Sequence, residues 1–160
     1  MFKKMRRIKQ QLSDNDTIEI LEKCKTGILG VLDENGYPYT IPLNYVYKNN
    51  KIYIHSAKEG HKIDAIKNCD KVSFCVIDKD DVVPKELTTY FRSVIVFGKA
   101  KILEDEKDIF EAAKILGLKY NNDIDFIEKE IKRFWNSLSC IEITIDHITG
   151  KEAKELVKTN

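Results

Sequence analysis

The sequence predicts a mainly β fold, a six-stranded antiparallel barrel with helices at its periphery. Several segments alternate apolar and polar residues with a period of two, which is typical of strands that bury one face. Most of these segments follow one another in hairpin order, and helical segments stand before, between and after them. Because strands and helices do not alternate as β-α-β units, the doubly wound and TIM-barrel classes are excluded.

The N-terminal part of the chain is expected to form a helix and then a strand. Ser13 or Asp14 can cap this helix, whose apolar residues recur at helical spacing. Residues 27–32 form a short apolar strand, and the Asn35-Gly36 pair after it is typical of a hairpin turn.

Residues 37–47 alternate for eleven positions, which predicts a long strand. This segment contains Pro38 and Pro42, and proline has no backbone N–H to donate to a neighbouring strand. We therefore expect part of the segment to be a sheet edge, a bulge or a place where another group docks.

The remaining elements are predicted from the same two spacings of apolar residues, the period of two for strands and the helical spacing for helices. Further strands are expected at 51–56, 71–77, 90–103 and 138–145, and helices at 61–68, 106–120 and 124–134. The polar residues 78–89 are expected to form an excursion between two strands. The chain is expected to be one domain over 1–160, with a core of about 13–148 and a loosely held, lysine-rich tail at 149–160.

Composition excludes several classes of function. The 27 basic and 26 acidic side chains nearly cancel, whereas nucleic-acid binding needs a basic footprint or stripe. No apolar run approaches the roughly 20 residues of a membrane span, and the N-terminus lacks the pattern of a signal peptide. The four cysteines have no metal-site spacing and are expected to be reduced thiols. We therefore expect a cytoplasmic protein that binds no metal, nucleic acid or membrane.

A candidate phosphate site lies where the strand 51–56 ends and the helix 61–68 begins. Ser56 offers a hydroxyl, Gly60 allows close approach of the backbone, and His61 and Lys62 are two potential cations at a helix N-terminus. Free backbone N–H groups, a hydroxyl and a cation together suit a phosphomonoester. The spacing of a P-loop is absent, and a plain solvated turn is the open alternative.

Four blocks of residues follow one another along the chain, at 36–39, 42–47, 55–62 and 88–98. Two of them carry the motifs His-Ser-Ala-x-x-Gly-x-Lys and Arg-Ser-Val-Ile-Val-x-Gly. In this order the blocks resemble the 5-nitroimidazole resistance (Nim) proteins, within the pyridoxamine 5′-phosphate oxidase-like superfamily of FMN-binding split barrels. The resemblance covers about residues 5–150.

The resemblance implies a six-stranded split β-barrel that forms a homodimer, with FMN in a groove between the subunits. The backbone of 42–45 would line the isoalloxazine, Ser56 and Ala57 would touch it, and 60–62 would hold the phosphate. Arg92 and Ser93 would come from the second subunit. The cofactor-binding residues implied by the resemblance are Pro42, Leu43, Asn44, Tyr45, His55, Ser56, Ala57, Gly60, His61, Lys62, Arg92 and Ser93.

His55 is the candidate catalytic residue, because the resemblance places it beside the flavin. There it could orient a substrate or donate a proton to a reduced product. The alternative is a strand-end histidine with a structural role, since alternation points His55 and Ser56 to opposite faces. Trp135 is expected in the core or an interface, with a flavin lid as the other possibility.

The resemblance implies an FMN-dependent oxidoreductase that takes electrons from a reduced nicotinamide or a protein donor. It would pass them to small electron-poor acceptors, nitroaromatics included. A non-catalytic flavin-binding or electron-carrier protein and a haem-handling protein are the open alternatives. Residues 149–153 lack the Arg/Trp segment with which pyridoxamine 5′-phosphate oxidases grip their substrate, so that substrate is not expected.

Overall fold

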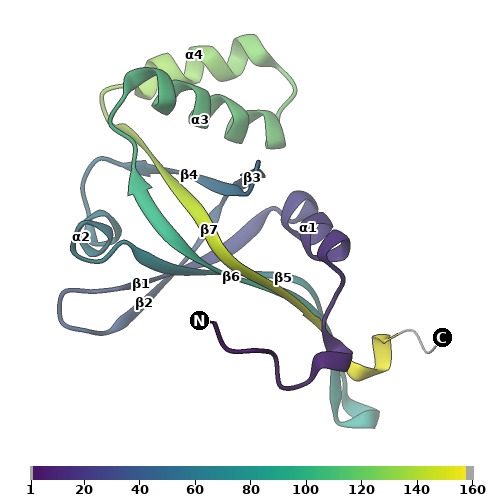
Figure 1. Cartoon of the computed structure of the whole chain (residues 1–160). Helices are drawn as coiled ribbons and strands as arrows, with labels where there is room; N and C mark the ends of the chain where they lie inside the picture. The colour runs from purple at the N-terminus through teal and green to yellow at the C-terminus, as the bar shows by residue number, and fades with distance from the viewer. Residues whose placement is uncertain (1, 158–160) are drawn as a thin grey trace.

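The computed structural model describes residues 2–157 and shows one antiparallel sheet of seven strands, in the order β2-β1-β5-β6-β7-β4-β3, with helices around it (Figure 1). The strands are β1 (Thr26–Leu32), β2 (Pro38–Asn44), β3 (Val46–Lys48), β4 (Lys51–Ala57), β5 (Lys71–Val83), β6 (Thr88–Ile102) and β7 (Leu138–Glu152). The helices are α1 (Asp14–Lys23), α2 (His61–Asn68), α3 (Glu106–Tyr120) and α4 (Ile124–Phe134). Short 3₁₀ turns lie at Ile8–Gln10, Pro84–Glu86 and Lys154–Leu156.

The segment 37–47 forms two strands, so the expectation of six strands is wrong. β2 pairs with β1, and β3 pairs with β4, at opposite edges of the sheet. Within residues 2–157 these two edges are not paired with each other, and the barrel is open. Of the three alternatives expected for the proline-containing part of this segment, the structure has the sheet edge, because both prolines lie in the edge strand β2.

Tyr45 is the residue at which the chain passes from one edge of the sheet to the other. Its side chain is fully buried, and its hydroxyl donates a hydrogen bond to the carbonyl of Leu21 at 2.8 Å. Its ring packs edge-on against Phe74 at a centroid distance of 5.0 Å. These contacts fix the crossing and therefore divide one alternating segment into two strands.

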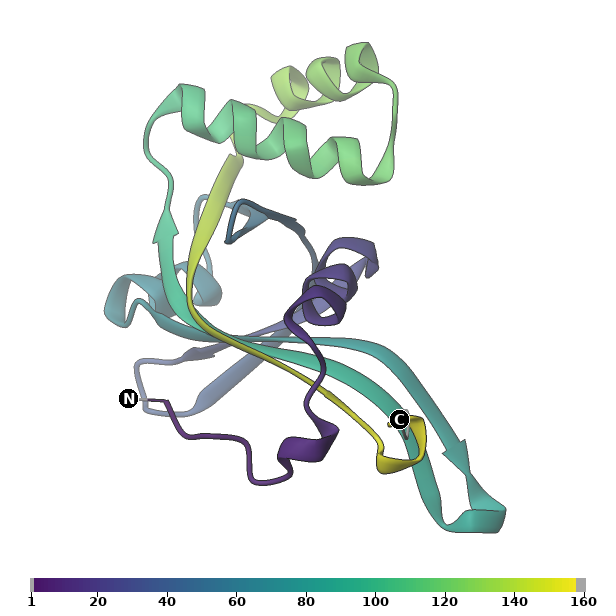
Figure 2. The same ribbon diagram turned by 45° about the vertical axis from the view of Figure 1, so that its right-hand side comes forward.

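The hairpin arm, residues 78–91, extends the β5–β6 pair away from the body of the sheet (Figure 2). The polar excursion expected at 78–89 is therefore wrong, since these residues are paired up to Val83 and Thr88. Much of the arm is exposed, so it carries polar residues without a clear alternation. At its tip Leu87 has a positive φ of 50° and is 95% exposed.

The C-terminal segment is better ordered than the sequence suggests. β7 continues to Glu152, which pairs with Arg92 of β6, and Lys151 forms a bridge with Gln11. A loosely held segment beginning at 149 is therefore not what the structure has. Residues 158–160 of the expected tail lie outside the described residues.

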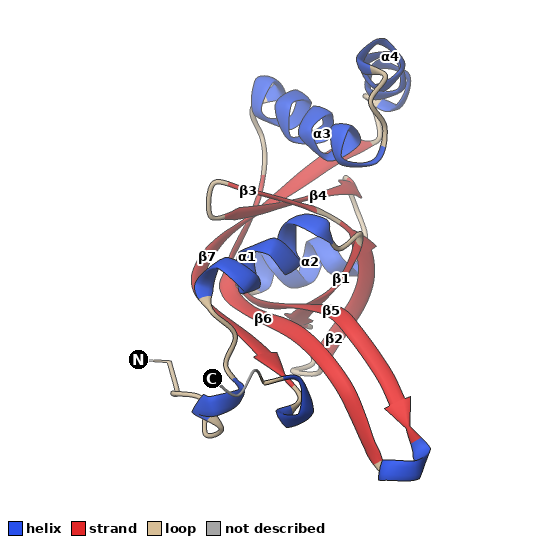
Figure 3. Cartoon of the chain, turned by 90° about the vertical axis from the view of Figure 1, so that its right-hand side faces the viewer, coloured by secondary structure: helices blue, strands red, loops and turns tan. Residues whose placement is uncertain are grey.

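Two apolar clusters hold the fold together. The larger one fills the barrel with side chains such as Leu29, Phe74 and Ile143, and α1 and α2 pack against it. The smaller one lies beneath α3 and α4, around Ile127 and Cys140. α3 and α4 form a helical hairpin over one end of the sheet, whereas the hairpin arm projects from the opposite end (Figure 3).

The helices expected at 61–68, 106–120 and 124–134 are confirmed. Ser13 caps α1, because its hydroxyl oxygen accepts a hydrogen bond from the N–H of Asp16 at 3.1 Å. No helix in residues 2–157 combines the length and apolar character that crossing a membrane requires.

Candidate functional site

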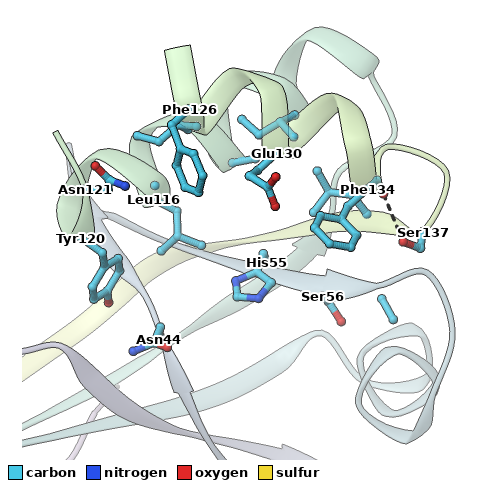
Figure 4. A pocket seen from close by; sticks show the side chains of 16 residues that line it. Asn44, His55, Ser56, Leu116, Tyr120, Asn121, Phe126, Glu130, Phe134 and Ser137 are labelled. Carbon is cyan, nitrogen blue, oxygen red and sulfur yellow. Dashed lines mark hydrogen bonds between the residues drawn. The ribbon is translucent and has the colours of Figure 1, made fainter. Parts of the chain in front are cut away.

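A cavity of about 590 Å³ lies between β4 and the α3–α4 hairpin (Figure 4). This volume falls within the roughly 300–1,000 Å³ that is typical of small-molecule sites. Its floor comes from Asn44 of β2 and from His55, Ser56 and Ala57 of β4, and its roof comes from the two helices. Four of the residues implied by the resemblance therefore meet in one cavity.

His55 and Ser56 are consecutive near the end of β4, and both line the cavity. Along the strand Ile52, Ile54 and Ser56 are buried, whereas His55 and Ala57 lie on the exposed face. Figure 4 shows the His55 ring beneath the helices and Ser56 one position further along the strand. Both line the cavity, although alternation turns their side chains to different faces.

The environment of His55 favours its neutral form. Loss of solvent contact lowers the pKa of His55, and the positive charge of Lys62 lowers it further. At neutral pH the imidazole therefore carries one N–H donor and one acceptor nitrogen. The segment 58–60 joins Ala57 of the cavity floor to the start of α2 at His61.

The N-terminus of α2 has the features of an anion site. Gly60 caps it with a φ of 126°, supplies no side-chain cap, and has open space where a side chain would begin. Within residues 2–157 the N–H groups of His61 and Lys62 have no acceptor. Uncapped N–H groups at a helix N-terminus attract anions.

Lys62 is a half-buried cation that forms no ion pair within the described part of the chain. Burial lowers the pKa of its ammonium group, because no neighbouring carboxylate offsets the loss of solvent. An anion bound at the start of α2 would compensate this charge.

The side chain of His61 contacts Tyr39 and Asp33 rather than the first turn of α2. Its ring stacks on Tyr39 with a centroid distance of 4.3 Å, and its Nε2 lies 3.6 Å from Oδ2 of Asp33. Asp33 in turn accepts hydrogen bonds from the N–H groups of Asn35 and Tyr37 in the β1–β2 turn. The structure therefore leaves the backbone N–H of His61, rather than its imidazole, at the anion site.

Of the four residues at 42–45, Asn44 lines the cavity. Pro42 is exposed on the β2 edge, and Leu43 packs against the barrel core. The backbone N–H of Tyr45 donates to the Tyr120 hydroxyl at 3.1 Å, and its carbonyl lies 2.8 Å from the same oxygen. The N–H of Tyr45 is thus satisfied by α3, and its carbonyl shares the one hydroxyl hydrogen of Tyr120 with the carbonyl of Lys25 at 2.7 Å.

Arg92 and Ser93 lie in the first half of β6, next to the hairpin arm, whereas β6 reaches α3 only at its other end. The Nε and Nη2 atoms of Arg92 donate to Oε2 of Glu152 at 2.9 and 2.8 Å. Neither residue lines the cavity of its own chain. Their contribution from a second subunit stays a prediction.

The roof of the cavity was not predicted from the sequence. Its prominent side chains are Leu116, Tyr120, Asn121, Phe126, Glu130 and Phe134. Phe134 is 50% exposed, and Phe126 is 51% exposed. The signal in the sequence that could have revealed the roof is that apolar residues cover more of α4 than the one stripe a helix needs to pack on the core. Trp135 packs in the smaller cluster near Phe110 and does not line the cavity.

Comparison with known proteins adds a family and a fold. Residues 13–152 match the family model described as pyridoxamine 5′-phosphate oxidase. No curated protein sequence matches the chain.

Three solved structures are similar to the chain at low sequence identity. A candidate 5-nitroimidazole antibiotic resistance protein from Bacteroides thetaiotaomicron has a TM-score of 0.73 at 22% identity, over 89% of this chain and 86% of that one. An FAD-binding protein from Mesorhizobium loti has a TM-score of 0.65 at 22% identity, over 91% and 98%. An FAD and haem binding protein from Mycobacterium smegmatis has a TM-score of 0.69 at 15% identity, over 95% and 77%. At these identities the likeness establishes the fold.

Proposed function

The chain belongs to the pyridoxamine 5′-phosphate oxidase family, and from that premise we propose that it is a cytoplasmic, homodimeric flavoprotein that binds FMN in the cavity beneath α3 and α4. The observation that carries this proposal is the α2 N-terminus, with Lys62 and its uncapped N–H groups, which follows the cavity-lining Ala57 after the short segment 58–60, next to a cavity volume of about 590 Å³. A mostly apolar cavity suits a flat ring system, and the helix N-terminus suits a terminal phosphate.

The donor set favours a single phosphate. The N-terminus of α2 offers one cluster of backbone donors and one unpaired cation, and no glycine-rich loop for a pyrophosphate occurs in the sequence. The similar proteins from Mesorhizobium loti and Mycobacterium smegmatis are FAD-binding, so FAD is the competing cofactor. Lys62 and the N–H groups of 61–62 would hold the phosphate, and Asn44, Ser56 and Ala57 would contact the ring.

We further propose that the protein reduces small electron-poor acceptors, nitroaromatics included, with electrons from a reduced nicotinamide or a protein donor. The bound flavin would supply the electron transfer. His55 is the one histidine among the described residues that line the cavity, and it can donate a hydrogen bond or a proton to the acceptor.

Titration with both flavins, followed by an acceptor assay, tests this proposal. We expect the purified protein to show a flavin spectrum and to bind FMN more tightly than FAD. NADH oxidation should then depend on an added nitroaromatic. Tighter binding of FAD would overturn the phosphate assignment, and bound FMN without acceptor-dependent oxidation would favour a carrier or storage role.

The homodimer is proposed because the hairpin arm exposes apolar side chains that one chain leaves uncovered. Val82 is 68% exposed and Leu87 is 95% exposed. The resemblance also implies that FMN lies between subunits. We expect light scattering to give about twice the chain mass of 18.6 kDa. A monomer that still holds FMN would remove Arg92 and Ser93 from the site.

A haem-handling role is the second candidate. It is favoured by the similarity to the FAD and haem binding protein, and by a histidine in the apolar cavity. A Soret band on titration with haemin that is lost in His55→Ala would support it.

A further inference from the structure

Glu130 places one carboxylate in a cavity whose lining is otherwise mostly apolar. It lies on α4 in the roof, and Figure 4 shows its side chain directed toward the His55 ring on the floor. Glu130 has no part in the proposed function.

The nearby cations leave the charge of Glu130 acting on the cavity. Arg133 lies 3.3 and 3.4 Å from the two Glu130 oxygens, and its own side chain is 68% exposed. Lys114 on α3 is instead paired with Glu128 at 2.7 Å. A solvated surface partner neutralises a carboxylate only weakly, so its field persists between the low-dielectric walls of the cavity.

Two aromatic rings flank this carboxylate. Phe126, Glu130 and Phe134 are spaced by four residues, which puts them on one face of α4, and all three line the cavity. Both rings are about half exposed, although large apolar side chains usually find cover. A flat aromatic molecule would cover them, and it would then lie beside the Glu130 carboxylate.

We propose that Glu130 selects acceptors by charge, admitting neutral and cationic aromatic acceptors and disfavouring anionic ones. This inference rests on the proposed function, because it takes the cavity roof as the acceptor site. Lys62 sets the opposite preference at the other end of the site, where the phosphate would bind. The cavity would therefore accept an anion at the start of α2 and reject one under α4.

Three probes of similar size and different charge test the inference: 4-nitrobenzyl alcohol, 4-nitrobenzoate and 4-nitrobenzylamine. Their dissociation constants are measured by calorimetry on the FMN-loaded protein, alongside the rates of reduction. We expect 4-nitrobenzoate to bind about tenfold more weakly than the alcohol, and the amine to bind at least as tightly. In Glu130→Gln the preference against the anion should fall to within about threefold.

Glu111→Gln is the matched control, because it removes the same charge from an exposed position on α3 outside the cavity. It should leave the preference unchanged. An anion preference that is the same in wild type, Glu130→Gln and Glu130→Ala would overturn the inference, as would an equal change in Glu111→Gln.

The calorimetry also separates this inference from the proposed function. A protein that binds FMN and reduces all three probes without charge preference would retain the proposed function and lose the inference. A protein that takes up no flavin would lose the proposed function, and the dissociation constants of the three probes, measured then on the flavin-free protein, would decide whether Glu130 selects by charge.

Discussion

The cations at the two ends of the sheet differ in whether a carboxylate pairs with them. Next to the hairpin arm, Arg92 is held by Glu152 through two short contacts of 2.9 and 2.8 Å. At the cavity end, Lys62 is half-buried and unpaired within residues 2–157, and burial lowers its pKa. A partly buried charge without a partner destabilises a fold. The Arg92–Glu152 pair therefore stabilises the base of the hairpin arm, whereas the cavity end keeps polar groups free for a ligand.

The largest effect at the cavity end is expected from replacing His55. We expect His55→Ala to keep FMN and to reduce nitroaromatics about 10²-fold more slowly, because a proton or hydrogen-bond donor to the acceptor is lost. Flavin absorbance of the purified variant and its steady-state rate measure the two effects. Turnover within twofold of wild type, with FMN bound, would return His55 to a structural role.

Lys62 tests the phosphate assignment. Removing one charge-assisted contact should weaken FMN binding by roughly 1.5–3 kcal/mol, or about ten- to a hundredfold, in Lys62→Ala. The free variant should melt no lower than wild type, because a half-buried unpaired charge is gone. Flavin titration and thermal melts measure both. Equal FMN affinity with an unchanged circular dichroism spectrum would exclude Lys62 from the site.

In contrast to Lys62, Arg92 is expected to contribute to stability rather than to FMN binding. Arg92→Ala leaves Glu152, which is buried, without its partner, so we expect a loss of about 2 kcal/mol in the free energy of unfolding. Urea denaturation measures this loss, and the double variant with Glu152→Gln should recover part of it. If FMN affinity fell as far as in Lys62→Ala, Arg92 would reach the partner's phosphate site and the contrast between the two ends would disappear.

Local patterns in the sequence predicted much of the fold. The helix at 61–68 follows Gly60, and the helix at 106–120 follows Asp105, whose carboxylate accepts from the first turn. The apolar period and the capping residue of a helix are both local features of the sequence, so they can be recognised without knowing which elements pack together. The division of 37–47 at Tyr45 could not be read in this way, because it depends on which strand each half pairs with.

The site was predictable where it depends on one continuous segment. His55, Ser56 and Ala57 meet in the cavity because they are consecutive at one strand end. The roof was not predictable, since Phe126 and Glu130 reach the cavity only through the packing of α4 over β4. The side chain of His61 was assigned to phosphate, but its ring stacks on Tyr39, a contact between segments 22 residues apart that the sequence does not reveal.

Lys119, near the end of α3, is an intermediate case between Lys62 and Arg92. Its Nζ donates to the carbonyl of Cys24 at 2.6 Å and lies 3.9 Å from the centroid of the Tyr45 ring. These partners are neutral, so burial lowers the pKa of Lys119 to about 8. A half-buried cation with neutral partners should remain charged at neutral pH and lose its proton in mildly alkaline solution.

The pH dependence of stability tests this assignment. In the unfolded chain the Lys119 pKa returns to about 10.4, so between about pH 8 and 10.4 the unfolded state binds more protons than the folded state. The free energy of unfolding should therefore rise with pH across this window. Between pH 7 and 9 we expect a gain of about 1 kcal/mol in wild type relative to Lys119→Met, measured by urea denaturation.

Lys114→Met is the control, because the Glu128 contact raises the pKa of Lys114 and moves its titration out of the window. A difference between wild type and Lys119→Met that stays constant from pH 7 to 9 would show that the Tyr45 ring and the Cys24 carbonyl hold the charge as well as a carboxylate does.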